Sequence, residues 1–160
     1  LKQFCILSTY AKQYTNVKLI GQGSFAKVYL SKRRADGAEF AVKTFDKRQL
    51  GSVEKAKASL INEINVMRKM KHENIIKLYE VIDQTDSDKL FMVIEYASGS
   101  QYLEWNDMTA EFYRTKGDKD RFSDEQTLRK IFRDCIRGLD YLHFNDVVHR
   151  DIKPQNILCD

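Results

Sequence analysis

Apolar and polar residues alternate with a period of two along much of the first third of the chain, which predicts three strands. We expect these strands over residues 14–21, 26–31 and 39–46. A turn rich in small residues separates the first two. The Asp36-Gly37 pair between the second and the third is typical of a hairpin. The N-terminal part of the chain is therefore expected to form an antiparallel sheet.

The third strand and the segment after it both carry a charge on an apolar face. Ala41, Lys43 and Phe45 share one face of the strand. The other face carries Phe40, Val42 and Thr44. Residues 52–70 have the spacing of an amphipathic helix, and Glu63 lies on or beside its apolar stripe. An unpaired carboxylate is costly in that position, so Glu63 requires a cation.

Two further apolar runs, 75–82 and 90–96, predict strands that are separated by a polar turn. They bring the number of expected strands to five. Residues 98–122 have the weakest pattern, in which 102–113 fit a short helix and 115–121 form a charged loop.

A longer amphipathic helix is expected from Ser123 to about Asn145. Gln126 follows Ser123 by three residues and completes a capping box. The stripe of this helix that we expect to be buried consists of Leu128, Ile131, Phe132, Cys135, Ile136, Leu139 and Leu142. A polar loop over 149–156 follows the helix.

The composition of the 160 residues is that of an ordinary globular protein, with 42% hydrophobic and 31% charged residues. The net charge of +4 is small and scattered, so it is only a weak argument for a nucleic-acid partner. No apolar run reaches the roughly 18 residues of a membrane span. Three distant cysteines, Cys5, Cys135 and Cys159, indicate neither a disulfide framework nor a zinc site and favour a reducing compartment.

The first chemical motif is the turn between the first two strands, Gly21–Val28, which has the form G-x-G-x-x-A-x-V. Glycines let the backbone approach an anionic ligand, and the N–H groups of such a turn can face phosphate oxygens. A tight hairpin without a ligand is an equally good interpretation of this motif alone. A dinucleotide-binding Rossmann turn does not fit, because the segment leads into a strand rather than a helix.

Lys43 and Glu63 form the second motif. A lone lysine on a strand is most often a solvated charge at a sheet edge. Glu63 lies twenty residues later on the inward stripe of the next helix, and two inward charges of opposite sign can pair. Such a pair would hold the Lys43 ammonium within reach of phosphate oxygens.

The third motif is the loop His149-Arg150-Asp151-Ile152-Lys153-Pro154-Gln155-Asn156. Its Asp151 and Asn156 can supply a base and a metal-binding oxygen to one centre. A hydroxyl nucleophile loses its proton during phosphoryl transfer, and a carboxylate within hydrogen-bond range can accept that proton. An amide oxygen is a suitable ligand for Mg²⁺. Taken singly, these residues would be an ordinary polar surface loop.

The three motifs, in this order, resemble those of eukaryotic-type protein kinases over about residues 14–160. The resemblance implies an α+β fold with an N-lobe, which has a five-stranded antiparallel sheet and one regulatory helix, and the first part of a helical C-lobe. It divides the chain into an N-terminal extension (1–13), the N-lobe and hinge (14–97) and the start of the C-lobe (98–160).

The resemblance also implies ATP and Mg²⁺ as cofactors. The glycine turn would cover the phosphates, and Lys43, paired with Glu63, would hold the α- and β-phosphates. Ile94 falls at the gatekeeper position. Val28, Ala41 and Leu158 would enclose adenine, and Glu95 and Ala97 would offer it hinge backbone groups. The full set implied at the nucleotide site is Gly21, Gln22, Gly23, Ser24, Val28, Ala41, Lys43, Glu95, Ala97 and Leu158.

In the polar loop, the resemblance makes Asp151 the catalytic base and Asn156 a Mg²⁺ ligand. Lys153 would stabilise charge on the transferred phosphoryl group, and its position resembles the serine/threonine form of the family. The expected acceptors are therefore serine and threonine hydroxyls of protein substrates. Arg150 beside Asp151 resembles kinases that are switched on by phosphorylation of an activation loop, which implies an upstream activating kinase.

Two features depart from the family pattern. Ala26 replaces the third glycine of the turn. The chain also ends at Asp160, before the expected Asp-Phe-Gly segment, whose aspartate binds Mg²⁺. We therefore expect residues 1–160 to be part of a larger kinase domain and to be inactive alone, since this chemistry depends on positioning and electrostatics. Residues 80–83 and 122–145 resemble the calcium/calmodulin-dependent kinase kinases.

Two alternatives remain. A pseudokinase or kinase-like binding module would usually lack the lysine, the base or the asparagine, and all three are present here. A naturally short variant that occupies partners without catalysis would need a stop codon after Asp160. The expected location is the cytoplasm, with access to the nucleus, and neither a nucleic-acid partner nor a membrane span is predicted.

Overall fold

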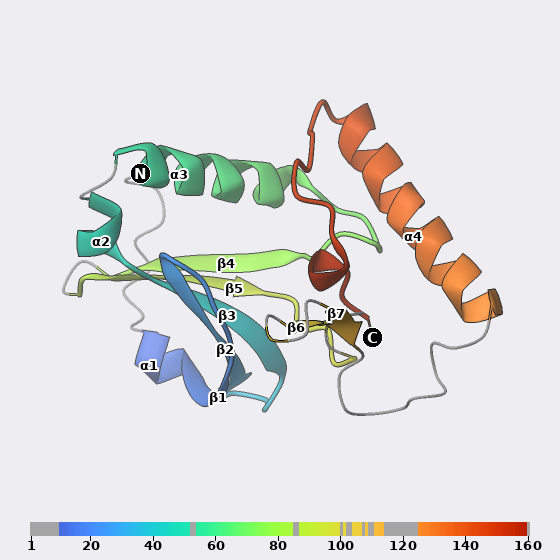
Figure 1. The fold of residues 1–160 in the computed structure, drawn as a ribbon. Coiled ribbons are helices and arrows are strands. Elements are labelled where there is room, and N and C mark those ends of the chain that lie inside the picture. The colour runs from blue at the N-terminus through green and yellow to red at the C-terminus, as the bar shows by residue number, and fades with distance from the viewer. Residues whose placement is uncertain are drawn as a thin grey trace. The chain divides into compact units, whose positions relative to one another are not determined.

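The chain forms two compact units (Figure 1). The first comprises Leu1–Met70 and Ile76–Tyr96, and the second comprises Lys71–Ile75 and Ala97–Asp160. The computed structural model describes residues 10–51, 54–84, 87–99, 101, 104–106, 108, 111–113 and 125–159.

A five-stranded antiparallel sheet, with strand order β1-β2-β3-β5-β4, forms the centre of the first unit. Its strands are β1 (Tyr14–Gln22), β2 (Ala26–Arg33), β3 (Glu39–Asp46), β4 (Leu78–Asp83) and β5 (Lys89–Ile94). Gly37, in the predicted hairpin turn, has a φ of 73°, which a glycine adopts without steric cost. The expected α+β fold with a five-stranded N-lobe sheet is confirmed.

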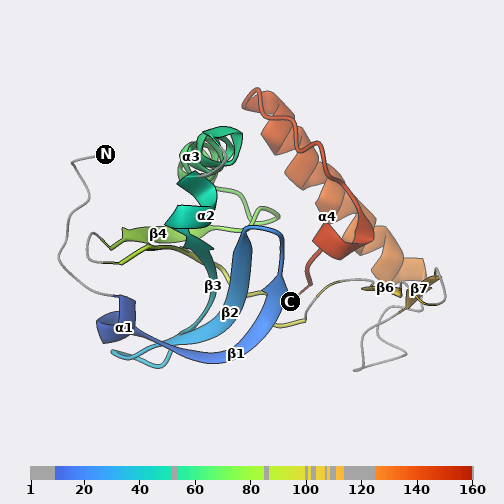
Figure 2. The same ribbon diagram turned by 60° about the vertical axis from the view of Figure 1, so that its left-hand side comes forward.

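Helices lie on both faces of this sheet (Figures 1 and 2). The predicted helix is present as α3 (Glu54–Lys69), and α1 (Tyr10–Gln13) lies on the opposite face. The short helix α2 (Lys47–Gly51) follows β3. Neither α1 nor α2 was expected from the sequence, because helices of one turn are too short to show a period.

The alternation in β3 sorts its side chains into two hydrophobic clusters. Phe45 joins the cluster on the α3 side, where it packs with Leu60 and Ile64. Phe40 and Val42 belong to the cluster on the other face, which we call the outer face. The face assignments expected for β3 are therefore confirmed.

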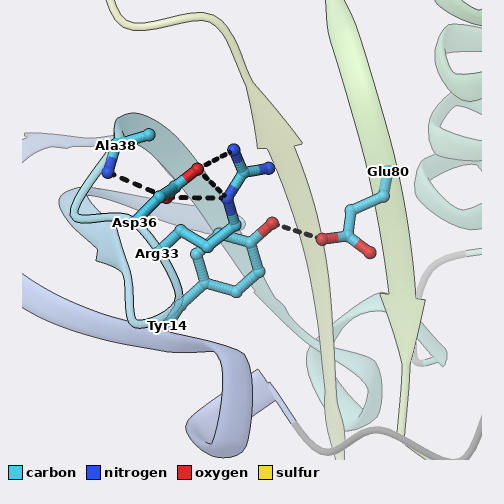
Figure 3. Close-up of polar contacts among 5 residues, drawn as sticks. All are labelled: Tyr14, Arg33, Asp36, Ala38 and Glu80. Carbon is cyan, nitrogen blue, oxygen red and sulfur yellow. Dashed lines mark hydrogen bonds and ion pairs between the residues drawn. The ribbon is translucent and has the colours of Figure 1, made fainter.

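On the outer face, the Tyr14 hydroxyl donates a hydrogen bond to the Glu80 carboxylate (Figure 3). The Tyr14 side chain is only 3% exposed, and its ring lies edge-on to Phe40. Burial and the bond to Glu80 raise the pKa of Tyr14. Since β1 and β4 are the two edges of the sheet, this one bond joins its opposite edges.

Tyr10 fixes α1 against the same face. Its ring stacks on Phe91 at a centroid distance of 4.1 Å. Its hydroxyl contacts Asn16 and lies 2.9 Å from the hydroxyl of Ser31, a fully buried residue. The Ser31 hydroxyl also donates to Asn16 at 2.9 Å, so the buried polar group has partners.

Arg33 and Asp36 clamp the β2–β3 hairpin (Figure 3). Arg33 Nη2 lies 2.6 Å from Asp36 Oδ2, and Asp36 Oδ1 accepts a hydrogen bond from the Ala38 N–H. The Arg33 bond, followed by the Ala38 bond, lowers the pKa of Asp36 to about 2. Because this folded-state pKa lies below the ordinary value, the stability it contributes is present above that value and is lost as the pH falls towards 2.

The second unit contains the helix α4 (Glu125–Phe144), a two-stranded antiparallel sheet and a short 3₁₀ helix, η1 (Pro154–Asn156). The sheet consists of β6 (Glu104–Asn106) and β7 (Glu111–Tyr113). The helix expected over 102–113 is therefore wrong in its described part. Trp105 and Phe112 are partners in the backbone register, and aromatic residues favour strands over a helix.

The helix α4 confirms the predicted element, but the expected burial of its stripe is wrong for three residues. Leu128, Phe132 and Ile136 are 40%, 70% and 49% exposed. Amphipathic spacing identifies the face that can pack, and it does not supply a partner for that face. The predicted cap at Ser123 and the charged loop at 115–121 lie outside the described residues.

The C-terminal half of α4 is covered by the segment Lys71–Ile75. The Lys71 N–H donates to the Tyr141 hydroxyl at 2.9 Å, and the rings of His72 and Tyr141 lie 4.9 Å apart. A Cβ on Gly138 would lie 3.0 Å from the Asn74 carbonyl oxygen, so glycine permits this close approach. Within the described ranges, no helix is long and apolar enough to cross a membrane.

Replacing Tyr14 with phenylalanine keeps the ring and removes the hydroxyl that bonds to Glu80. We expect Tyr14→Phe to lower the free energy of unfolding by about 1–2 kcal/mol, because a largely buried hydrogen bond is lost and a carboxylate loses its donor. Chemical denaturation measures this change. Tyr79→Phe, at a ring that is 48% exposed, is the matched control and should leave stability close to wild type. Equal stability of the two variants would contradict the importance of the bond.

Candidate active site

Lys43 and Glu63 form the ion pair that the sequence leads us to expect. Lys43 lies opposite Val28 on β2 and Met92 on β5, on the face covered by α3. Its Nζ is 2.8 Å from Glu63 Oε1, and the two side chains are 30% and 40% exposed. A pair this open to water contributes little to stability. Its main consequence is to fix the position of the ammonium group.

The glycine turn lies at the end of the same sheet. Gly21 pairs with Val28 across the β1–β2 ladder, and the Gly23 N–H donates to the Ala26 carbonyl at 2.8 Å. A Cβ on Gly21 would meet nothing closer than 3.6 Å, and one on Gly23 nothing closer than 3.9 Å. Neither glycine has a positive φ. The turn does not itself need these glycines, which favours a role in admitting a ligand close to the backbone.

The remaining first-unit residues of the implied nucleotide site lie on or next to β3 and β5. Ala41 is buried and stands opposite Ile94, the expected gatekeeper. The Glu95 N–H donates to the Lys77 carbonyl at 2.9 Å, and Glu95 Oε2 accepts from the Lys77 N–H. These two hydrogen bonds fix Glu95 against Lys77.

A hollow of about 250 Å³ lies beside the glycine turn, but on the outer face of the sheet. Asn16, Tyr29, Thr44 and Phe91 contribute to its lining. Gly23 and Ser24 of the implied nucleotide site also line it, whereas Thr44 points to the opposite side of β3 from Lys43.

In the second unit, the loop before η1 brings Asp151 and Lys153 together with Asn156, the last residue of η1. Lys153 Nζ is 3.0 Å from Asp151 Oδ2. Asn156 Nδ2 donates to the same Oδ2 at 2.8 Å and to the Asp151 carbonyl at 2.7 Å. Arg150, directly before Asp151, has a φ of 64°, an uncommon conformation for a side-chain-bearing residue and one that is enriched at functional sites.

These contacts set the charge of Asp151. The hydrogen bond from Lys153, followed by that from Asn156, lowers the pKa of the Asp151 carboxyl. The carboxylate is therefore ionised at neutral pH and keeps lone pairs for a hydroxyl donor.

Asn156 is suitably arranged to serve as an oxygen ligand for a metal. Its Nδ2 is committed to Asp151, which leaves Oδ1 as the atom able to bind a cation. In the part of the chain that the structure describes, no three or more His, Cys, Asp or Glu side chains gather into a metal site. The donor set suits Mg²⁺, which commonly takes one or two protein oxygens and completes its shell with phosphate oxygens and water.

Leu158 and Ala97, the last two residues of the implied nucleotide site, also belong to the second unit. Leu158 forms an isolated antiparallel bridge with Gln101 and is 43% exposed. The structure thus divides the implied residues between the two units, pairs Lys43 with Glu63 in the first and gathers Asp151, Lys153 and Asn156 in the second, and their chemical roles stay predictions.

Comparison with known protein families assigns the chain to one of them. A family model described as protein kinase domain matches residues 14–160. The chain belongs to the protein kinase domain family, and several of its relatives are named as serine/threonine-protein kinases.

Three relatives illustrate the similarity. Serine/threonine-protein kinase GRIK2 of Arabidopsis thaliana is 38% identical over 151 residues, which cover 91% of this chain and 34% of the relative. CBL-interacting protein kinase 26 of Oryza sativa subsp. japonica is 36% identical, with 92% and 27% covered. Maternal embryonic leucine zipper kinase of Danio rerio is also 36% identical, with 96% and 20% covered. The chain thus spans about a third or less of the length of these relatives.

Some structurally important residues were not identified from the sequence. Tyr141 anchors the Lys71 backbone, and Gly99 contacts the backbone of Cys159. Both contacts join segments that lie far apart in the chain, so local periodicity carries no signal for them.

Lys153→Ala removes the largest cause of the lowered pKa of Asp151. We expect the pKa of Asp151 to rise towards the ordinary aspartate value, and Asn156→Ala to produce a smaller rise, because its bond is the second cause. NMR titration of the Asp151 carboxyl measures both shifts. Lys130→Ala, on α4, is the control and should leave the titration unchanged. An Asp151 pKa that is unaffected by Lys153→Ala would contradict the geometry of the loop.

Proposed function

We propose that the protein is an ATP-dependent protein kinase that transfers the γ-phosphoryl group of ATP to serine or threonine hydroxyls of protein substrates. The observation that carries this proposal is the Asp151–Lys153–Asn156 cluster in a chain of the protein kinase domain family. Residues 1–160 would contribute the N-lobe and the first part of the C-lobe to the active domain.

Lys43 binds ATP in this proposal. An ammonium group has three N–H donors, and Glu63 occupies one of them. The other two are available for oxygens of the α- and β-phosphates. The glycine turn, where both glycines leave space, covers the phosphates with its backbone N–H groups.

Asp151 orients the attacking hydroxyl. Its lowered pKa keeps the carboxylate ionised and makes it a weak base, so it accepts a hydrogen bond first and takes the proton as the new P–O bond forms. Lys153, 3.0 Å from the same carboxylate, places a positive charge where the transferred phosphoryl group passes.

Asn156 would hold Mg²⁺ through its Oδ1 atom. A Mg²⁺ ion bound there would help to neutralise the negative charge of the phosphate oxygens. Asn156 also supports Asp151 through Nδ2, so a single side chain links the metal position to the base.

Lys153 supports a serine or threonine acceptor, as do the relatives named as serine/threonine kinases. Arg150 supports control by an upstream kinase, because its guanidinium can pair with a phosphorylated activation loop. We place the protein in the cytoplasm with access to the nucleus. The intact lysine, base and asparagine favour an enzyme over a pseudokinase or binding module.

Lys43→Met and Asp151→Asn in the full-length protein test the mechanism. We expect Asp151→Asn to reduce kcat by about a hundredfold to ten-thousandfold, the usual contribution of a general base, and Lys43→Met to weaken ATP use as well. A phosphate-transfer assay on a protein substrate measures both. Asp146→Asn, an exposed aspartate of the preceding turn, is the matched control and should keep wild-type turnover. Near-normal turnover of Asp151→Asn would refute the assignment of the base.

The isolated residues 1–160 provide a separate test. We expect no turnover in the same assay, because positioning and charge stabilisation by the rest of the domain would be lost. Phosphate transfer by this chain alone at the full-length rate would contradict that expectation.

A further inference from the structure

Two segments of the second unit meet backbone to backbone beside the implied nucleotide site. The Gly99 N–H donates to the Cys159 carbonyl at 2.8 Å. Two residues away, Gln101 and Leu158 form an antiparallel bridge. The segment after the hinge is thus paired with the segment after the catalytic loop.

This pairing requires a residue without a Cβ at position 99. A Cβ on Gly99 would lie 2.6 Å from the Cys159 carbonyl oxygen and 2.8 Å from its carbonyl carbon. Both are backbone atoms, so the conflict cannot be relieved by a side-chain rotation. Of the six glycines whose surroundings are described, Gly99 alone has a contact under 3.0 Å. Gly51, by contrast, has nothing within 4 Å.

We propose that Gly99 is a positioning residue for nucleotide binding: it lets the backbone at Gly99 and Gln101 pair with Cys159 and Leu158, and thereby sets the place of Leu158. The inference rests on the proposed function, in which Leu158 contacts adenine. It adds a residue that the sequence motifs do not include.

The effect of Gly99 should be confined to the binding of the adenine ring. Displacing Cys159 moves Leu158, its neighbour in the chain, and breaks the bridge to Gln101. Asp151, Lys153 and Asn156 are held by contacts with one another, and the Ile157 N–H bonds to the Pro154 carbonyl of η1 at 3.2 Å. These contacts isolate the catalytic cluster from a shift at Cys159.

The experiment compares Gly99→Ala with Gly51→Ala in the full-length protein. We expect Gly99→Ala to raise the Kd for ATP and the Kd for adenosine by a similar factor, about tenfold, which corresponds to one lost packing contact. The kcat at saturating ATP should stay close to wild type, and so should the KM for the protein substrate. Gly51→Ala should leave all of these values unchanged. Calorimetry measures the Kd values. Adenosine reports on the contacts of adenine and ribose alone, because it carries no phosphate.

The possible outcomes are distinct. If wild type binds neither ATP nor adenosine, the proposed function itself is wrong. If wild type binds both and Gly99→Ala binds them equally well, the role of Gly99 is overturned. A fall in kcat that matches the loss of affinity also overturns it, since that indicates general damage. If Gly99→Ala does not fold, Leu158→Ala keeps both backbones in place and must still raise the Kd for adenosine, and an unchanged Kd refutes the proposal.

Discussion

The central strand β3 is packed on both faces. The position of the Lys43 side chain, on the face covered by α3, follows from that constraint. Val42, on the outer face, is fully buried, as is Val93 on the neighbouring strand β5. A strand buried in this way cannot shift its register by one residue without placing every side chain on the wrong face. Lys43 is therefore directed towards α3, where Glu63 meets it at 2.8 Å. The ammonium position depends on the whole sheet.

The loop that carries Asp151 fixes a charged side chain with few residues and no large core. Asp151 lies in an exposed loop, where a single side chain would sample many conformations. Lys153 and Asn156 reduce that freedom through two contacts with the same carboxylate oxygen, and they also keep it charged. In this loop, orientation and ionisation thus have the same physical cause.

The sequence predicts those features that depend on local patterns. The first three strands, the hairpin at Gly37 and the Lys43–Glu63 pair follow from periodicity and from the cost of burying a charge. The helix expected over 102–113 was wrong because that segment is rich in aromatic residues, which favour strands, and a helical window does not take this propensity into account. The exposed Phe132 shows the other limit, since amphipathicity identifies a face but not what covers it. Contacts between distant segments, such as Tyr14 with Glu80, require the fold itself.

The central claim is that this chain belongs to an enzyme that transfers phosphate, and a radiolabel measures that transfer directly. Full-length protein is incubated with Mg²⁺, a protein substrate and ATP labelled at the γ-phosphate, and the acid-stable phosphoamino acids are then separated. The account predicts label in phosphoserine or phosphothreonine. Label in neither residue from protein that demonstrably binds ATP would contradict it and would indicate a kinase-like binding module.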